Sequence, residues 1–182
     1  MGFRVLKFGG SSVADATAMS RVLDIVGGAL DGGRVVLVSS AISGCTDELL
    51  ACADGNTEGE AALMERHLAI VRRLFTGIDQ AEASEEVVSL FAAMEAAPAE
   101  EKVTFGELLS TRILARKLEC ERIRTHWVDS RELVVKDDLP EALASIAACS
   151  DCTLITGIKD SGNGTKVVYE NGSLSEIGRA HV

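Results

Sequence analysis

Aromatic residues and positive charge are both scarce in this 182-residue sequence. Aromatics make up 4% of it, while alanine, valine, leucine and glycine are frequent, which favours helices packed on a buried sheet over a β-sandwich. The formal net charge of −10 argues against a basic nucleic-acid-binding surface, so we expect no nucleic-acid partner. An anionic substrate is compatible with this charge, because backbone amides and one lysine can hold a phosphate locally.

Long apolar runs and a cysteine framework are absent too. No stretch reaches the ~18 apolar residues of a membrane span, and the first residues lack a charged-then-apolar signal pattern. The five cysteines are odd in number and scattered, which favours a reducing compartment over a disulfide framework. Cys149 and Cys152 have C-x-x-C spacing, but without a second pair or a nearby histidine we predict no metal site and favour a structural role over a redox pair. We therefore expect a cytoplasmic protein with no membrane partner.

The composition, 47% hydrophobic and 25% charged, suits one large globular α/β domain. Hydrophobic periodicity predicts strands over 4–8, 35–38, 123–128 and 153–156, helices over 13–30, 48–53, 58–75, 82–97, 103–120 and 140–149, and an exposed strand over 166–169. The first strand, helix and strand form a βαβ unit, which predicts parallel strands. We interpret residues 55–100 as a helical insertion that covers the sheet and helps the protein to oligomerise, with Gly77-Ile78-Asp79 separating its two helices.

The stretch from Val5 to Val13 has the layout of a strand, a phosphate-binding turn and a helix N-terminus. Lys7 ends the apolar run, and its ammonium group would neutralise a phosphoryl group in a crevice. Gly9 and Gly10 would let backbone N–H groups approach that phosphoryl group closely. The alternative is a surface lysine before an ordinary turn, and the stretch by itself does not separate the two. The spacing is not that of a P-loop.

Two further stretches carry candidate binding groups. One is the loop after the second strand, whose hydroxyls and free amides would bind a carboxylate or an amino acid: Ser40, Ser43, Gly44 and Thr46. The other is Glu107 near the start of helix 103–120, which would pair with a substrate ammonium group. The alternatives are a capping loop and a carboxylate that complements the helix dipole. Ligands of open α/β sheets bind at the carboxyl ends of strands. The loops that follow the first and the second predicted strand are therefore expected to face one crevice.

Other polar residues are expected to be structural or solvated. Neither His67 nor His126 has a partner at metal-ligand spacing, so each is expected to be structural or exposed. Arg66, Arg72 and Arg73 are interpreted as a solvated helix face.

Three motifs in order resemble those of the aspartokinases, which belong to the amino acid kinase superfamily: Lys7–Val13, Val38–Leu50 and Phe105–Ser110. The segment Trp127–Arg131 is also similar to the family pattern, and the match covers roughly residues 3–157. The resemblance implies a three-layer αβα sandwich with a mainly parallel sheet, truncated to its N-terminal part. It implies ATP-dependent phosphorylation of the β-carboxylate of L-aspartate to 4-phospho-L-aspartate, the first step towards lysine, threonine and methionine. It also implies ATP and Mg²⁺ as cofactors and a homo-oligomer.

The resemblance assigns roles to the candidate residues by position. Lys7 would stabilise the transferring phosphoryl group, as the catalytic residue. Gly9, Gly10 and Ser11, which replaces the usual threonine of the family, would lie along the phosphates. Ser40 and Thr46 would hold aspartate, and Glu107 would take its α-ammonium group. A lysine, backbone amides and Mg²⁺ are chemically sufficient, because phosphoryl transfer depends on positioning and charge stabilisation.

The end of the sequence departs from the family. After Gly157, aspartokinases continue into an Arg-Gly-Gly-Ser-Asp type motif, a nucleotide-binding half and regulatory domains, none of which is present here. We therefore expect residues 1–157 to be the N-terminal portion of a kinase domain and 158–182 a divergent or non-native tail. The expected activity of the chain by itself is weak or nil. The alternatives are an acetylglutamate- or carbamate-kinase-like enzyme and a non-catalytic fragment that self-associates.

Overall fold

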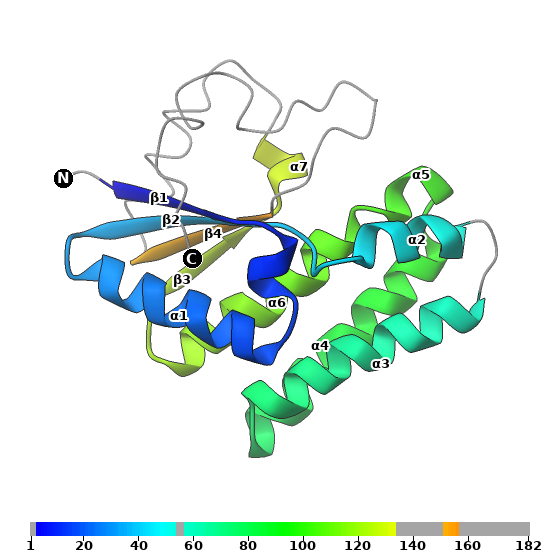
Figure 1. Cartoon of the computed structure of the whole chain (residues 1–182), viewed down its shortest axis with the longest axis horizontal. Helices are drawn as coiled ribbons and strands as arrows, with labels where there is room; N and C mark the ends of the chain where they lie inside the picture. Colours follow the sequence, from blue (N-terminus) through cyan, green and yellow to red (C-terminus); the bar gives the residue numbers. More distant parts are fainter. Residues whose placement is uncertain (1–2, 54–56, 134–150, 157–182) are drawn as a thin grey trace.

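The computed structural model describes residues 3–53, 57–133 and 151–156 (Figure 1). These residues contain a four-stranded sheet in the order β1-β2-β4-β3, in which all three pairings are parallel. The strands are β1 (Phe3–Phe8), β2 (Arg34–Ser39), β3 (Thr125–Val128) and β4 (Cys152–Thr156). Their carboxyl ends therefore meet at one edge of the sheet. The predicted α/β fold with a parallel sheet is confirmed.

The central strands β2 and β4 are buried along almost their whole length, as expected for the inner strands of a parallel sheet. Helix α1 (Ala16–Leu30) connects β1 to β2. The Asp15 carboxylate caps its start by accepting a hydrogen bond from the Ala18 N–H at 2.8 Å. Met19, Val22 and Val26 recur at helical spacing and are buried on the side that faces the sheet.

Helices α1 and α6 (Phe105–Cys120) pack against the sheet and lie on the same side of it in Figure 1. One continuous hydrophobic core joins alternate residues of the strands to these helices, and its largest buried members include Phe8, Met19, Leu37, Leu109, Leu114 and Leu154. The predicted helix 140–149 lies outside the described residues.

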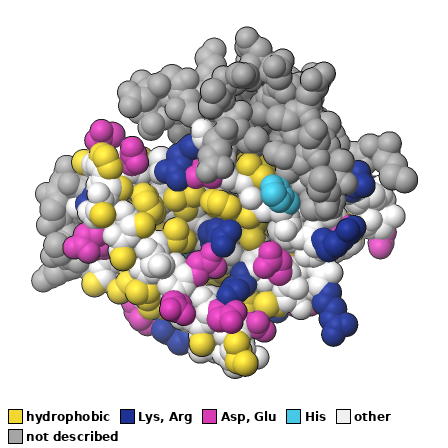
Figure 2. Space-filling view, turned by 180° about the vertical axis from the view of Figure 1, so that it is seen from behind, with side chains coloured by type: hydrophobic (Ala, Val, Ile, Leu, Met, Phe, Trp, Pro, Cys, Tyr) yellow, Lys and Arg dark blue, Asp and Glu magenta, His cyan; other side chains and the backbone are white. Residues whose placement is uncertain are grey.

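The helical insertion is arranged differently from the expectation. Helices α3 (Thr57–Leu74) and α4 (Gly77–Ala96) pack against each other, and their principal other contacts are with helices α1, α2 (Cys45–Ala53) and α6. They therefore thicken the helical layer beyond α1 and α6 (Figure 1). Ion pairs tie α4 to α6, between Glu86 and Arg112 and between Glu82 and Arg116. In the view of Figure 2, acidic and basic side chains are interspersed over the described surface.

Several element boundaries differ from the prediction. The segment Gly77-Ile78-Asp79 opens α4 instead of separating two helices, because the positive φ of Gly77 turns the chain directly into the helix. The predicted helix 13–30 begins at Ala16 instead, since Asp15 caps its start, and a separate 3-10 helix, η1 (Gly10–Val13), precedes it. Two short helices, α5 (Ala99–Lys102) and α7 (Ser130–Leu133), were not predicted. The predicted strand 166–169 lies outside the described residues.

Within the described ranges, no helix combines the length and the apolar character that crossing a bilayer requires.

Candidate functional site

We call the segments that follow the strand ends, residues 8–13, 39–46 and 128–131, the carboxyl edge. Two of its loops are joined by backbone hydrogen bonds: the N–H of Ser40 donates to the Phe8 carbonyl at 3.1 Å, and the N–H of Ser43 donates to the Gly10 carbonyl at 3.1 Å. A Cβ atom on Gly10 would lie 2.9 Å from the Ala41 carbonyl oxygen, so a residue without a side chain is required. The two loops therefore lie side by side at this edge, and the expectation that they face one crevice stays a prediction.

The start of α6 packs against the second of these loops. A Cβ atom on Gly106 would lie 2.8 Å from Ala41 Cβ and 3.1 Å from Cys45 Sγ. The Ser110 hydroxyl donates to the Ser40 carbonyl at 2.8 Å. The first turns of α6, which contain Glu107, are therefore held against the 39–46 loop.

The electrostatics of this contact place a carboxylate beside the loop. Burial, and next to it the negative charge of the nearby Glu107 carboxylate, raise the pKa of the Cys45 thiol to about 12. Cys45 thus stays protonated and packs as a small apolar residue rather than serving as a nucleophile. Glu107 itself is half-buried.

The other predicted residues surround this contact. Lys7 is exposed near the end of β1, and the strand register pairs it with Val38 rather than with Leu37, a core residue that faces α1 and α6. Because side chains alternate along a strand, Lys7 approaches the carboxyl edge from the sheet face opposite α6. Gly9 is exposed, with open space around its Cα.

The hydroxyl residues differ in exposure. Ser11 and Thr46 are exposed on the same edge, and Ser40 is half-buried. The Ser40 N–H donates to the Phe8 carbonyl, and the Ser40 carbonyl accepts from the Ser110 hydroxyl. Both of these hydrogen bonds are made by the backbone of Ser40 and leave its side-chain hydroxyl out. Direct contacts thus join the segments of Gly10, Ser40 and Glu107, while Lys7, Ser11 and Thr46 share the edge with them.

Arg66 on α3 has a role that the sequence analysis missed. Its Nη1 lies 2.8 Å from Glu48 Oε1, and its Nη2 donates to the Ser43 carbonyl. It braces the loop on both sides of Thr46, so its interpretation as part of a solvated face is wrong. Arg72 fits that interpretation, because it pairs with Glu65 at an exposed position. No local pattern links an arginine to a loop 23 residues away.

A polar cluster of Thr104, Asp129, Ser130, Arg131 and Thr156 closes the other side of the carboxyl edge. The Arg131 guanidinium donates to the buried Asp129 carboxylate at 2.6–3.0 Å and to Thr104 Oγ1 at 3.1 Å. The Ser130 N–H donates to Thr156 Oγ1 at 2.8 Å, and that hydroxyl donates to Ser130 Oγ at 2.9 Å. The cluster joins the ends of β3 and β4 to the start of α6.

The histidines are placed as expected. His67 is buried, its Nδ1 lies 2.9 Å from the Leu63 carbonyl, and its ring meets Phe91 edge-on. Burial lowers the pKa of His67 to about 4, so the ring is neutral near pH 7 and Nδ1–H donates to the carbonyl. His126 is exposed on β3.

Among the residues that the structure describes, no three histidine, cysteine, aspartate or glutamate side chains are grouped to hold a metal ion. Cys149 lies outside the described residues. Cys152 is buried in β4, where desolvation raises the pKa of its thiol to about 12.

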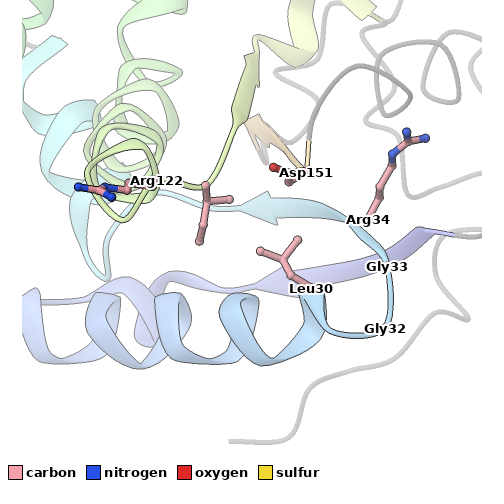
Figure 3. A pocket seen from close by; sticks show the side chains of 7 residues that line it. Leu30, Gly32, Gly33, Arg34, Arg122 and Asp151 are labelled. Atoms are coloured by element: carbon pink, nitrogen blue, oxygen red, sulfur yellow. The ribbon is translucent and has the colours of Figure 1, made fainter.

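A cavity of about 500 Å³ lies at the opposite edge of the sheet, which we call the amino edge. The residues that line it define that edge: Leu30, Gly32, Gly33, Arg34, Arg122, Ile123 and Asp151. Figure 3 shows Leu30 directed into the space between α1 and β2, whereas the guanidinium groups of Arg34 and Arg122 point away from it. The polar groups do not converge there, so the carboxyl edge is the better candidate site.

Comparisons with known proteins point to one family. A model described as the amino acid kinase family matches residues 2–170. Lysine-sensitive aspartokinase 3 of Escherichia coli (strain K12) is 34% identical over 161 residues, which cover 81% of this chain and 35% of that protein. The chain thus spans about a third of this relative's length.

Two solved structures of E. coli aspartokinase III are similar. The complex with lysine and aspartate has a TM-score of 0.67 at 29% identity, over 84% of this chain and 40% of that one. The complex with aspartate and ADP has a TM-score of 0.63 at 26% identity, over 85% and 40%.

Proposed function

This chain belongs to the amino acid kinase family, and from that premise we propose that it is the substrate-side portion of an aspartate kinase. The reaction is the ATP-dependent phosphorylation of the L-aspartate β-carboxylate to 4-phospho-L-aspartate. The observation that carries the proposal is the convergence of three separate segments at the carboxyl edge, through Gly10, Ser40 and Gly106. A relative whose solved structure contains aspartate and ADP supports the substrate and nucleotide classes.

The phosphate side of the site is formed by β1 and the turn after it. The exposed Lys7 ammonium group would neutralise charge on the transferring phosphoryl group, and the open space at Gly9 admits a phosphate close to the backbone. Ser11 would add a hydroxyl donor. A β-carboxylate oxygen of aspartate attacks the γ-phosphorus while the bond to the ADP oxygen breaks. Mg²⁺, when bound, supplies further charge neutralisation, and its main ligands would be nucleotide phosphates and water, because the described residues contain no carboxylate cage for it.

The amino acid side of the site is formed by the 39–46 loop and α6. Thr46 lies in the first turn of α2, where the helix dipole favours a carboxylate, and the Ser40 hydroxyl offers a second donor. Glu107 would accept the α-ammonium group, at a point where the start of α6 is pressed against this loop. An ammonium partner at this position favours aspartate over N-acetylglutamate, whose amine is acylated.

The 182-residue chain is expected to bind L-aspartate and to have little or no kinase activity. Its sequence lacks the Arg-Gly-Gly-Ser-Asp type motif that follows in the aspartokinases. A cytoplasmic location is part of the same proposal, supported by the four free cysteines among the described residues. A homo-oligomer is proposed from the resemblance to the aspartokinases alone.

Ligand-dependent thermal unfolding tests the substrate. L-Aspartate is expected to raise the melting temperature in a saturable way, whereas D-aspartate and N-acetyl-L-glutamate leave it unchanged. Glu107→Gln should abolish the L-aspartate effect, while Glu119→Gln, an exposed position on the same helix, should retain it.

Three results would contradict the proposal. Stabilisation by N-acetyl-L-glutamate alone would favour the acetylglutamate-kinase-like alternative. No response to any of these amino acids, from an oligomer in light scattering, would favour a non-catalytic self-associating fragment. Rapid formation of aspartyl phosphate, trapped with hydroxylamine, would overturn the expectation of low activity.

A further inference from the structure

The first turn of α6 has low intrinsic helix stability, and yet it is packed closely against the 39–46 loop. Gly106 in its first turn costs about 1 kcal/mol of helix stability relative to alanine. Thr104 occupies the N-cap position, but its side chain does not cap the helix. The hydroxyl of Thr104 instead donates to the Glu101 carbonyl at 2.7 Å and accepts a hydrogen bond from Arg131.

The Arg131 guanidinium is itself held in one place. Asp129 is 6% exposed, and a buried carboxylate is costly unless donors surround it. Arg131 supplies these donors through its backbone N–H at 2.9 Å and through Nε and Nη2. The remaining Nη1 group is thereby aimed at Thr104, which precedes Arg131 by 27 residues in the sequence.

A second contact, from β3 itself, reaches α6 about two helical turns beyond Thr104. The Trp127 indole N–H donates to Thr111 Oγ1 at 2.9 Å, and the Thr111 hydroxyl donates to the Glu107 carbonyl at 2.6 Å. The contacts of β3 and its carboxyl end therefore flank Glu107, three residues before it at Thr104 and four residues after it at Thr111.

We propose that Asp129 and Arg131 are positioning residues that hold the first turn of α6, through Thr104, so that Glu107 faces the 39–46 loop. An ordinary N-cap side chain accepts a hydrogen bond from a backbone N–H of the first helical turn. The Arg131 guanidinium instead fixes the position of Thr104, the N-cap residue of α6. The consequence for aspartate binding rests on the proposed function, whereas the placement of α6 does not.

The chain provides a matched pair for the test. Thr104→Val removes the hydroxyl at nearly constant shape and leaves the Asp129–Arg131 pair intact, and Thr104→Ser restores the hydroxyl. Arg124→Gln is the control, because Arg124 pairs with Asp151 at 2.9–3.1 Å at the other end of the same two strands and is exposed.

Two measurements are made on the full 182-residue chain. Amide hydrogen exchange follows residues 105–110, with β2 as the internal reference. Calorimetry follows the affinity for L-aspartate. Trp127, the single tryptophan of the sequence, adds a fluorescence signal from the contact between β3 and α6.

Thr104→Val is expected to speed exchange at residues 105–110 by about tenfold and to weaken L-aspartate binding by about five- to tenfold. Thr104→Ser should recover both, and Arg124→Gln should change neither by more than about twofold. Unchanged exchange at 105–110 in Thr104→Val, or a rise of the same size in β2, would overturn the proposal. If the unsubstituted chain binds no L-aspartate while Thr104→Val still speeds exchange only at 105–110, the positioning role stands and the proposed function fails.

Discussion

At the carboxyl edge, Gly10 and Gly106 let three segments approach within contact distance, whereas at the amino edge the segments around Gly32 and Arg122 stay apart and leave a cavity of about 500 Å³. Each edge has an arginine–aspartate pair: Arg124 and Asp151 join the starts of β3 and β4 at the amino edge, whereas Asp129 and Arg131 both follow β3 at the carboxyl edge and contact Thr104 at the start of α6. The pair at the carboxyl edge is partly buried and also holds α6, while Arg124 and Asp151 at the amino edge hold only each other's strands in an exposed position.

This contrast indicates what fixes a binding site in a parallel sheet. The carboxyl edge has its candidate groups held by backbone hydrogen bonds, glycine contacts and a satisfied buried charge. The amino edge has a cavity of about 500 Å³, but the guanidinium groups of Arg34 and Arg122 point away from it (Figure 3).

The largest expected effect comes from placing a side chain in the close contact of the carboxyl edge. Gly106→Val should force α6 away from Ala41 and Cys45 and lower the free energy of unfolding by about 3 kcal/mol. Gly32→Ala at the amino edge should cost less than about 0.5 kcal/mol, because its new Cβ meets only the movable guanidinium of Arg4. Urea unfolding of both variants measures the difference. Equal costs would remove the contrast between the edges.

Acid should weaken the carboxyl edge before the amino edge, through His67. The pKa of His67 is about 4 in the folded state, whereas an unperturbed histidine, as in the unfolded chain, has a pKa of 6.5. Between pH 4 and pH 6.5 the unfolded state therefore binds more protons than the folded state. The free energy of unfolding should therefore fall as the pH drops through this window, by about 2 kcal/mol between pH 7 and 5, and level off below about pH 4. Arg66, which donates to the Ser43 carbonyl, is the neighbour of His67 in α3. As the pH falls, amide exchange should therefore quicken at residues 39–46 before it does at residues 32–35. His67→Leu should remove most of this pH dependence, and a loss that persists in His67→Leu would assign it to another group.

The brace from α3 should have a smaller effect. Arg66→Gln removes an ion pair and a charge-assisted hydrogen bond to the Ser43 carbonyl, and should cost about 1 kcal/mol with faster exchange at 39–46. Arg72→Gln, on the same helix, should cost about 0–0.3 kcal/mol, because its pair with Glu65 is exposed. If the two variants unfold alike, Arg66 is no more than a surface charge.

The smallest effect is expected at the amino edge. A hydrogen bond from Arg124 holds the pKa of Asp151 below its usual 3.8. The stability that this pair contributes is present above pH 3.8 and is lost as the pH falls through the lower folded value. Arg124→Gln should thus lower the free energy of unfolding slightly above about pH 4, and its difference from the unsubstituted chain should vanish as the pH falls below that range. In 1 M NaCl the difference should be suppressed at every pH. A difference that survives high salt would place this pair in the interior.

Features with a local signal could be predicted from the sequence. The run Val35–Val38 is continuously apolar, and Leu154 and Ile155 lie between two β-branched threonines, which is why both central strands could be predicted. The glycines and hydroxyls after β1 and β2 indicated that two loops would meet at the carboxyl edge. Helices α5 and α7 have four residues each, too few for a periodic pattern to appear.

Features that depend on distant partners could not be predicted. Arg66 looks like its neighbours on α3 until the fold brings Ser43 to it. Gly77 was taken as a helix breaker, because the sequence alone does not show that the helix starts there with a positive φ. The side of the sheet from which Lys7 approaches follows from strand register, which pairs it with Val38.

The strand order has a consequence for how the molecule is made. β3 pairs with β4 in the described sheet, and β4 also pairs with β2, although β4 comes last of the four in the chain. During synthesis β1, α1 and β2 can assemble early, but one side of β2 stays open until Cys152–Thr156 has left the ribosome. Pairings of such long sequence separation form slowly, so the sheet should complete in a late step. Any partner that covers the unpaired side of β2 until β4 is made would therefore act while the chain is still being synthesised.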